Sequence, residues 1–285
     1  MRIHEDVMRG LERGAAVVAL ESAVITAGLP REVFAKAKEI DGEWDVSGGT
    51  NFELVRAMER TVRKGGAIPA SVAVIDGEIR VGLCEDELRV FASDERAEKA
   101  ASRDLAHVMV KKESAGTTVS ATLAVMKMVN RECEKRGWAG RMRVFATGGI
   151  GGVHREWSRK LDVSADLRAI AQTKACVVCA GVKSILDVRA TLEALEALEV
   201  VVLGYRTDVF PQFQCAGEAD VRVARRVDDA RSVAELCEKH WGCIGHEGGV
   251  IAAQSVPAKF AMEHGELERA ITAAERAANE AEISG

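Results

Sequence analysis

The sequence predicts a single three-layer α/β/α domain with a mixed, mostly parallel central sheet. Short runs rich in β-branched residues alternate with longer segments of helical periodicity, which is the spacing of repeated strand and helix units. No internal repeat, proline-rich linker or low-complexity tract interrupts the alternation, and only four prolines occur in 285 residues. Because a chain of this length can bury a core without disulfides or metals, we expect one domain over residues 1–285.

The elements follow in order along the chain. The expected strands are short apolar runs at residues 16–20, 71–75, 79–83, 144–146, 175–179 and 200–203. The expected helices lie between or after them, at residues 51–65, 85–98, 117–136, 183–198 and 231–240. A final Ala-rich, charged helix over about 266–282 has little apolar face, so we expect it to pack loosely or to meet a partner. Residues 31–50 are predicted to be a surface insertion.

Composition excludes several classes of partner. The net charge of −5 comes without a block of Lys or Arg, which argues against nucleic acid as the main ligand. The longest apolar stretches are far shorter than the roughly 18 residues of a membrane span, and the N-terminus does not resemble a signal peptide, so we expect no membrane partner and a cytoplasmic location. The seven cysteines are irregularly spaced and are predicted to be reduced thiols, with Cys176 and Cys179 as small apolar residues of a buried strand.

A glycine cluster, Thr147-Gly-Gly-Ile-Gly-Gly-Val-His154, follows a predicted strand, where α/β folds place ligands. It is not a dinucleotide fingerprint, because His154 stands where the last glycine belongs, and the sequence contains no Gly-Lys dipeptide of a phosphate loop. Glycines let backbone N–H groups approach an anion or a sugar closely. We interpret the cluster as part of a functional site, with a purely structural turn as the alternative.

Four further segments carry residues suited to chemistry. Asp162, Ser164 and Asp166 alternate and would project to one side of an extended chain, as ligands of a divalent cation or a polyol, or else they cap a helix that leads to Ala171. Lys183 follows a strand at the expected opening of a helix, a setting that favours a neutral, nucleophilic amine, although most lysines are simply solvated.

Glu21 ends an apolar strand and suits a general acid or base, or alternatively a buried ion pair. Lys99, Ser102-Arg103-Asp104 and Thr117-Thr118 could together clamp a phosphate, but each is also common as a surface charge or a helix cap.

Taken together, these segments resemble the pseudouridine-5′-phosphate glycosidase family, which includes indigoidine-cluster proteins and C-glycoside synthases. The similarity covers roughly residues 10–265. The matching stretches are Ala19-Leu-Glu-Ser22 with Gly28-Leu-Pro30, Gly66-Ala-Ile-Pro-Ala70 with Val81-Gly-Leu83, Thr117-Thr-Val-Ser-Ala-Thr122, Phe145-Ala-Thr-Gly-Gly-Ile-Gly-Gly-Val-His-Arg155, Asp162-Val-Ser-Ala-Asp166, Val178-Cys-Ala-Gly-Val-Lys-Ser-Ile-Leu-Asp187 and Gly204-Tyr-Arg-Thr-Asp-Val-Phe-Pro211.

The resemblance implies an enzyme that cleaves the C–C glycosidic bond of pseudouridine 5′-phosphate to uracil and ribose 5-phosphate through a lysine imine. It implies Glu21 as proton donor and acceptor, Lys183 as nucleophile, and Asp162 as ligand of Mn²⁺ or another divalent cation. The residues implied for the sugar phosphate are Lys99, Val119, Ser164, Ala165 and Asp166, to which we add Thr117 from the possible phosphate clamp and His154 from the matched loop.

Two other functions are compatible with the same residues: a C-glycoside synthase joining ribose 5-phosphate to an aromatic acceptor, and an inactive sugar-phosphate-binding or scaffold protein. The resemblance also implies a homo-oligomer, with a trimer favoured. Since the sequence ends at Gly285, we expect the family's C-terminal region to be absent, and we expect slower turnover if nothing else covers the site.

Overall fold

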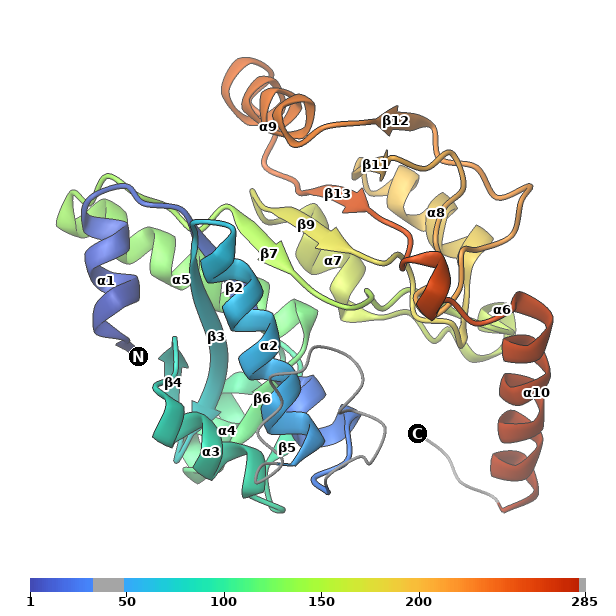
Figure 1. Ribbon diagram of the computed structural model, residues 1–285, viewed down its shortest axis with the longest axis horizontal. Helices are drawn as coiled ribbons and strands as arrows, with labels where there is room; N and C mark the ends of the chain where they lie inside the picture. Colours follow the sequence, from blue (N-terminus) through green and yellow to red (C-terminus); the bar gives the residue numbers. More distant parts are fainter. Residues whose placement is uncertain (33–48, 282–285) are drawn as a thin grey trace. The chain divides into compact units, whose positions relative to one another are not determined.

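The computed structural model describes residues 1–32 and 49–281, so most of the predicted insertion at 31–50 lies outside the described residues (Figure 1). The chain divides into two compact units, Met1–Ala146 and Thr147–Gly285, which we call the first and the second unit. The expectation of one domain over 1–285 stays a prediction. Each unit is described by itself.

The first unit contains a mixed sheet whose strands run in the order β1-β4-β3-β2-β7, with β6 also pairing to β3 and β5 to β6. Strand β2 is parallel to β3 and β7, whereas β3 is antiparallel to β4 and β6. The strands are β1 (Arg2–Ile3), β2 (Val17–Leu20), β3 (Ile68–Ile75), β4 (Glu78–Val81), β5 (Glu98–Ala100), β6 (Ala115–Thr117) and β7 (Val144–Ala146).

Helices cover both faces of this sheet (Figure 1). Phe52 and Val55 of α2 join Phe91 of α3 and Ala73 of β3 in one buried cluster. On the other face α1 comes so close that a Cβ on Gly10 would lie 2.4 Å from the Ile68 side chain. The helices of the first unit are α1 (Glu5–Glu12), α2 (Thr50–Lys64), α3 (Glu85–Ser93), α4 (Leu105–Lys111) and α5 (Val119–Arg136), with a π-helix at Val24–Gly28.

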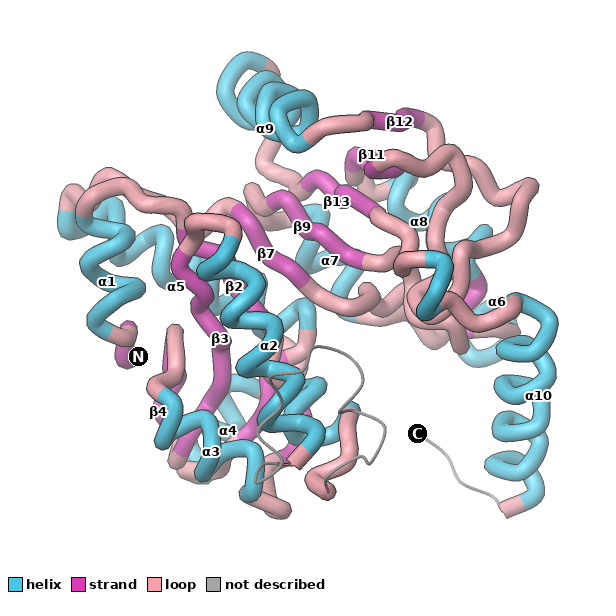
Figure 2. Tube along the Cα trace, viewed as in Figure 1, coloured by secondary structure: helices cyan, strands magenta, loops and turns pink. Residues whose placement is uncertain are grey.

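The second unit is built on four parallel strands in the order β9-β13-β11-β12, which lie side by side in Figure 2. Val233 and Cys237 of α9 pack on Cys176, Leu203 and Val250 of the sheet. The strands are β8 (Val153–His154), β9 (Cys176–Cys179), β10 (Leu186–Asp187), β11 (Val201–Tyr205), β12 (Arg225–Val227) and β13 (Val250–Ala253). The helices are α6 (Trp157–Lys160), α7 (Ala165–Ala171), α8 (Val188–Ala197), α9 (Ala230–Glu238) and α10 (His264–Glu280), with a π-helix at Lys239–Cys243 and a 3₁₀ turn at Ala258–Phe260.

The predicted fold class, a mixed and mostly parallel sheet between helices, is confirmed, but several boundaries differ from the predicted ones. The helix expected over 85–98 ends at Ser93, and strand β5 follows it. The helix expected over 183–198 begins only at Val188, because the Asp187 side chain accepts a hydrogen bond from the Ala190 amide at 2.9 Å and caps it there. None of the helices within residues 1–32 and 49–281 is long and apolar enough to cross a membrane.

Candidate active site

Glu21 lies directly after β2 in the first unit, and its side chain is only 7% exposed, as predicted. The next residue, Ser22, fixes this strand end. Its amide donates to the Thr117 carbonyl at 3.2 Å, while its hydroxyl accepts from the Thr117 amide at 3.0 Å and donates to the Val72 carbonyl at 2.5 Å. Glu21 is therefore held beside the carboxyl end of β6.

The other three candidates of the first unit gather at the same place. Lys99 is exposed on β5 and pairs across the ladder with Gly116 of β6. The buried Thr117 hydroxyl donates to the Val72 carbonyl at 2.7 Å, so this side chain serves the fold. Val119 is the first residue of α5, and the N-cap Thr118 makes no side-chain capping bond, which leaves an uncapped helix N-terminus beside Lys99 and Glu21.

The glycine cluster of the second unit is explained by close packing. A Cβ on Gly151 would lie 2.7 Å from Asp166 Oδ2, and one on Gly152 would lie 2.3 Å from Thr191 Oγ1. These contacts support the structural alternative for the glycines themselves. The same packing brings the loop against Asp166, a predicted site residue.

Ser164 and Asp166 both lie against Gly151, whereas Asp162 faces His154. Ser164 is the N-cap of α7, which begins at Ala165, and its hydroxyl accepts from the Asp166 amide at 3.2 Å. The capping alternative is therefore correct for Ser164. Asp166 is 4% exposed and accepts from the Gly151 amide at 2.9 Å, whereas the Asp162 side chain is 55% exposed. The segment is not extended over its whole length, because helix α7 begins at Ala165 between the two aspartates.

Asp162 lies opposite His154, whose amide donates to the Asp162 carbonyl at 3.0 Å. Their side chains approach to 3.6 Å between His154 Nδ1 and Asp162 Oδ2. Within the described ranges no group of three or more His, Cys, Asp or Glu side chains is placed to hold a metal. A carboxylate with one imidazole fits a divalent cation that keeps most of its water or takes further oxygen ligands from a substrate.

Lys183 is half-buried and is joined to the glycine cluster through its backbone. Its amide donates to the Ile150 carbonyl at 3.0 Å, and the Ile150 amide donates to the Gly181 carbonyl at 3.0 Å. The Lys183 carbonyl accepts from Leu186 at 3.0 Å in a turn that precedes α8. The predicted place of Lys183 at a helix opening is therefore wrong, but its place beside the cluster is clear.

Sequence reasoning missed an ion pair next to this turn. Arg155 binds Glu268 of α10 with both arms of its guanidinium, at 3.0 and 2.8 Å. The two residues are 113 positions apart, so no local pattern connects them. The first half of helix α10 packs on its own unit, where Leu267 and Ile271 are buried against Cys215, whereas residues 272–277 are exposed.

The cysteines have the predicted structural role. All seven are free thiols, and Cys176 and Cys179 are buried in β9. Burial raises the pKa of the Cys179 thiol to about 12. The pKa of Cys176 is also raised, mainly by a hydrogen bond to Cys237 and secondly by burial. Neither thiol is therefore a ready nucleophile.

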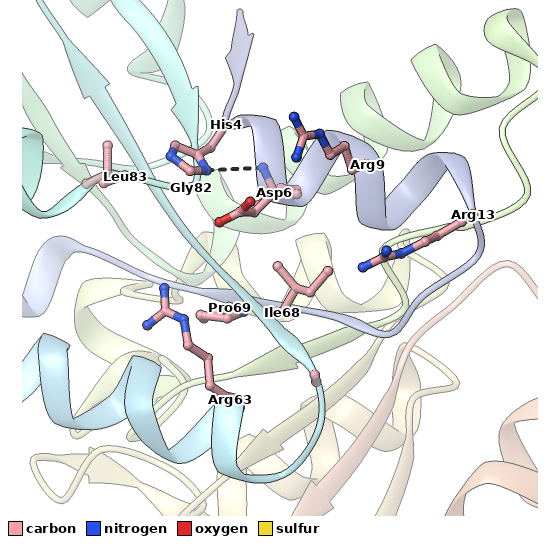
Figure 3. A pocket seen from close by; sticks show the side chains of 11 residues that line it. His4, Asp6, Arg9, Arg13, Arg63, Ile68, Pro69, Gly82 and Leu83 are labelled. Atoms are coloured by element: carbon pink, nitrogen blue, oxygen red, sulfur yellow. Dashed lines mark hydrogen bonds between the residues drawn. The ribbon is translucent and has the colours of Figure 1, made fainter.

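A cleft of about 280 Å³ in the first unit lies apart from these residues (Figure 3). It is lined by His4, Asp6, Arg9, Arg13 and Arg63 among others, and it includes none of the predicted site residues. Arg9 and Arg63 already have glutamate partners in their own helices, and Asp6 adds a further negative charge. The cleft is therefore close to neutral despite its arginines.

Comparison with known proteins gives consistent matches. Residues 45–285 match the family model described as indigoidine synthase A like protein. A pseudouridine-5′-phosphate glycosidase of Caldanaerobacter subterraneus is 38% identical over 269 residues, covering 94% of this chain and 78% of the relative. One of Sorangium cellulosum is 39% identical over 285 residues, covering 100% of this chain and 80% of the relative.

Two solved structures are similar over nearly the whole chain. The prealnumycin C-glycosynthase AlnA, in complex with ribulose 5-phosphate, has a TM-score of 0.78 and 33% identity, and the match covers 100% of this chain and 82% of AlnA. An indigoidine synthase A-like protein of Thermotoga maritima has a TM-score of 0.74 and 32% identity, covering 91% of this chain and 77% of that protein.

Proposed function

The chain belongs to the indigoidine synthase A-like family. We propose that it is a pseudouridine-5′-phosphate glycosidase of the lyase type, as its relatives' names indicate for the glycosidase activity. The observation that carries the proposal is the backbone pairing of Lys183 with Ile150 inside the glycine cluster, at the loop that Asp166 also holds. These hydrogen bonds fix the backbone of Lys183 against the glycine loop, which supports a role for its amine as the nucleophile.

The reaction explains why a lysine is wanted. Ordinary glycosidases protonate a leaving oxygen, but pseudouridine joins ribose to uracil through carbon. The C1′–O4′ bond of the ribose ring breaks and O4′ takes up a proton, and the Lys183 amine bonds to C1′ and gives up a proton. The C1′–C5 bond then breaks, its electron pair goes to the uracil ring, which takes up a proton, and the nitrogen lone pair forms the C1′=N imine. Water hydrolyses the imine, which frees ribose 5-phosphate and restores the amine.

The remaining candidates receive complementary roles. Glu21, buried at the end of β2, would donate and accept the protons. The exposed Lys99 and the uncapped N-terminus of α5 at Val119 would attract the phosphate, because both carry positive charge. In the second unit, the segment from Ser164 to Asp166 would contact the sugar. Asp162, with His154, would hold the divalent cation, which supplies positive charge toward the sugar phosphate.

The test combines turnover with trapping of the imine. Purified protein with Mn²⁺ and pseudouridine 5′-phosphate should release uracil, followed by ultraviolet absorbance. Borohydride with ribose 5-phosphate should add mass at Lys183. Lys183→Ala should abolish both signals, whereas Lys239→Ala, at an exposed lysine of the same unit, should keep them. No adduct at saturating ribose 5-phosphate, or an adduct that persists in Lys183→Ala, would refute the mechanism.

A C-glycoside synthase is the second candidate, favoured by the structural similarity to AlnA. Both functions need a sugar phosphate at Lys183, so trapping alone does not separate them. Release of uracil from pseudouridine 5′-phosphate supports the glycosidase. Imine formation without that release supports the synthase.

A further inference from the structure

Arg155 connects three segments of the second unit around the turn that contains Lys183. Its guanidinium donates to both oxygens of Glu268 in α10, at 3.0 and 2.8 Å. The nitrogen that makes the shorter of these bonds also donates to the Ser184 carbonyl at 3.3 Å. Ser184 follows Lys183 directly, so the ion pair holds the peptide next to the proposed nucleophile.

The same turn is held from the other side by buried side chains. The Ser184 hydroxyl donates to the main-chain carbonyl of Gln212 at 3.0 Å. The side-chain Nε2 of Gln212 donates in return to the Ser184 carbonyl at 3.3 Å. Gln212 is only 2% exposed. The Ser184 carbonyl thus has two donors, Arg155 and Gln212, and Glu268 holds the first of them.

The geometry of the ion pair restricts the movement of Arg155 relative to α10. The side chains of Arg155 and Glu268 are only 29% and 30% exposed, and a bidentate guanidinium–carboxylate pair fixes both distance and plane. Leu267 and Ile271 seat α10 in the unit. The position of α10 is therefore linked through Glu268 to the backbone beside Lys183.

We propose that Arg155 and Glu268 are positioning residues, which use helix α10 to hold the Lys183 turn in the geometry needed for attack of its amine on C1′ of the sugar. The inference rests on the proposed function of Lys183. It adds a role for α10 and for an ion pair that does not touch the reacting atoms. Loss of the pair should slow imine formation without weakening the binding of the sugar phosphate, since a small misplacement of a nucleophile costs rate.

The test compares Glu268→Gln and Arg155→Lys with a matched control, Glu275→Gln, which removes the same charge from an exposed position of the same helix. Borohydride trapping is measured over a range of ribose 5-phosphate concentrations. In Glu268→Gln the maximal rate should fall about 10-fold or more, while the half-saturating concentration changes less than about twofold. Glu275→Gln should match the wild type. Arg155→Lys keeps the positive charge and can still pair with Glu268, but it cannot make the two parallel hydrogen bonds of the guanidinium. Its maximal trapping rate should therefore fall nearly as far as that of Glu268→Gln.

Amide hydrogen exchange over residues 183–187, without ligand, gives a second readout that does not depend on the reaction. It should be faster in Glu268→Gln than in Glu275→Gln. Equal trapping rates and equal exchange in these two variants would overturn the inference. If the wild type forms no imine, the proposed function fails, whereas faster exchange in Glu268→Gln would still uphold the link from α10 to the turn. If Glu268→Gln does not fold, Arg155→Lys decides by the same two measurements.

Discussion

At the scale of single residues, the candidate carboxylates differ in environment, and we base the roles proposed for them on this difference. Glu21 is buried at a strand end, and Asp166 is buried on a backbone amide of the glycine cluster. Asp162 is largely exposed next to His154. The sequence alone predicted the position of Glu21, because this residue directly follows an apolar run that forms a strand. It could not separate Asp162 from Asp166, since the start of a helix between them decides which one is buried.

Glu21→Gln tests proton transfer. The amide keeps the size and hydrogen bonding of the side chain but cannot donate or accept the proton, so uracil release should fall roughly 10²-fold or more. Affinity for ribose 5-phosphate should change little. Steady-state assays with a binding titration check both, and Glu95→Gln, at an exposed glutamate of the same unit, serves as control. Normal turnover in Glu21→Gln would exclude the role.

Metal removal tests Asp162. A hard cation held by one carboxylate and one imidazole should be lost to excess chelator, so the reaction should stop and should resume when Mn²⁺ is added back. Asp162→Ala should need much more Mn²⁺ for half-maximal rate. Unchanged turnover in chelator, or in Asp162→Ala, would show that Asp162 is a structural residue that only faces His154.

At the scale of elements, periodicity predicts that a helix exists better than where it begins. Helix α8 was expected from residue 183, but the Asp187 cap starts it at Val188. Strand β13 at Val250–Ala253 was not predicted, although it pairs with both β9 and β11 in the sheet. The role of α10 also depends on tertiary contacts. Arg155, which binds Glu268 of this helix, is distant in sequence and could not be recognised as a partner. The prediction therefore relied on the small apolar face of the helix, which suggested weak packing.

Gly152→Ala tests the packing explanation of the glycine cluster. The added methyl group would lie 2.3 Å from Thr191 Oγ1, so either Thr191 or the loop must move. We expect a loss of about 1–3 kcal/mol in the free energy of unfolding, as for other overpacked sites. Gly242→Ala is the matched control, since a Cβ there meets nothing within 4 Å. Equal denaturant midpoints for the two variants would contradict the packing argument.

The ion pair of α10 should make stability depend on pH. Hydrogen bonding to Arg155 lowers the pKa of Glu268 in the fold, with smaller contributions from the Arg155 charge, His264 and Gln212, against the opposing effect of burial. Its contribution to stability is therefore fully present above the ordinary pKa of glutamate and is lost as the pH falls through the lowered value. The stability difference between wild type and Glu268→Gln, measured by urea unfolding, should shrink on the acid side. A difference that is constant from pH 7 to pH 3 would contradict this.

At the scale of the whole molecule, the residues predicted for the site are divided between the two units. Glu21, Lys99 and Val119 belong to the first unit, whereas the glycine cluster and Lys183 belong to the second. Neither unit alone holds both the proposed proton donor and the proposed nucleophile. The sequence predicted this full set of residues only through the resemblance of its ordered motifs, since their spacing along the chain does not bring them together.

Assembly is the last property that we predict. Trp157, Leu161 and Val163 of the second unit expose large apolar side chains, Leu161 to 76%, and such neighbouring exposed residues are typical of surfaces that other chains cover. With the homo-oligomer implied by the family resemblance, we expect a trimer of about 92 kDa by light scattering, from chains of 30.6 kDa. Leu161→Glu should shift the mass toward the monomer, because a buried unpaired carboxylate is costly. Val110→Glu, at an exposed valine of α4, should leave the mass unchanged. A wild-type monomer at all concentrations would refute the prediction, and equal masses for wild type and Leu161→Glu would place the interface elsewhere.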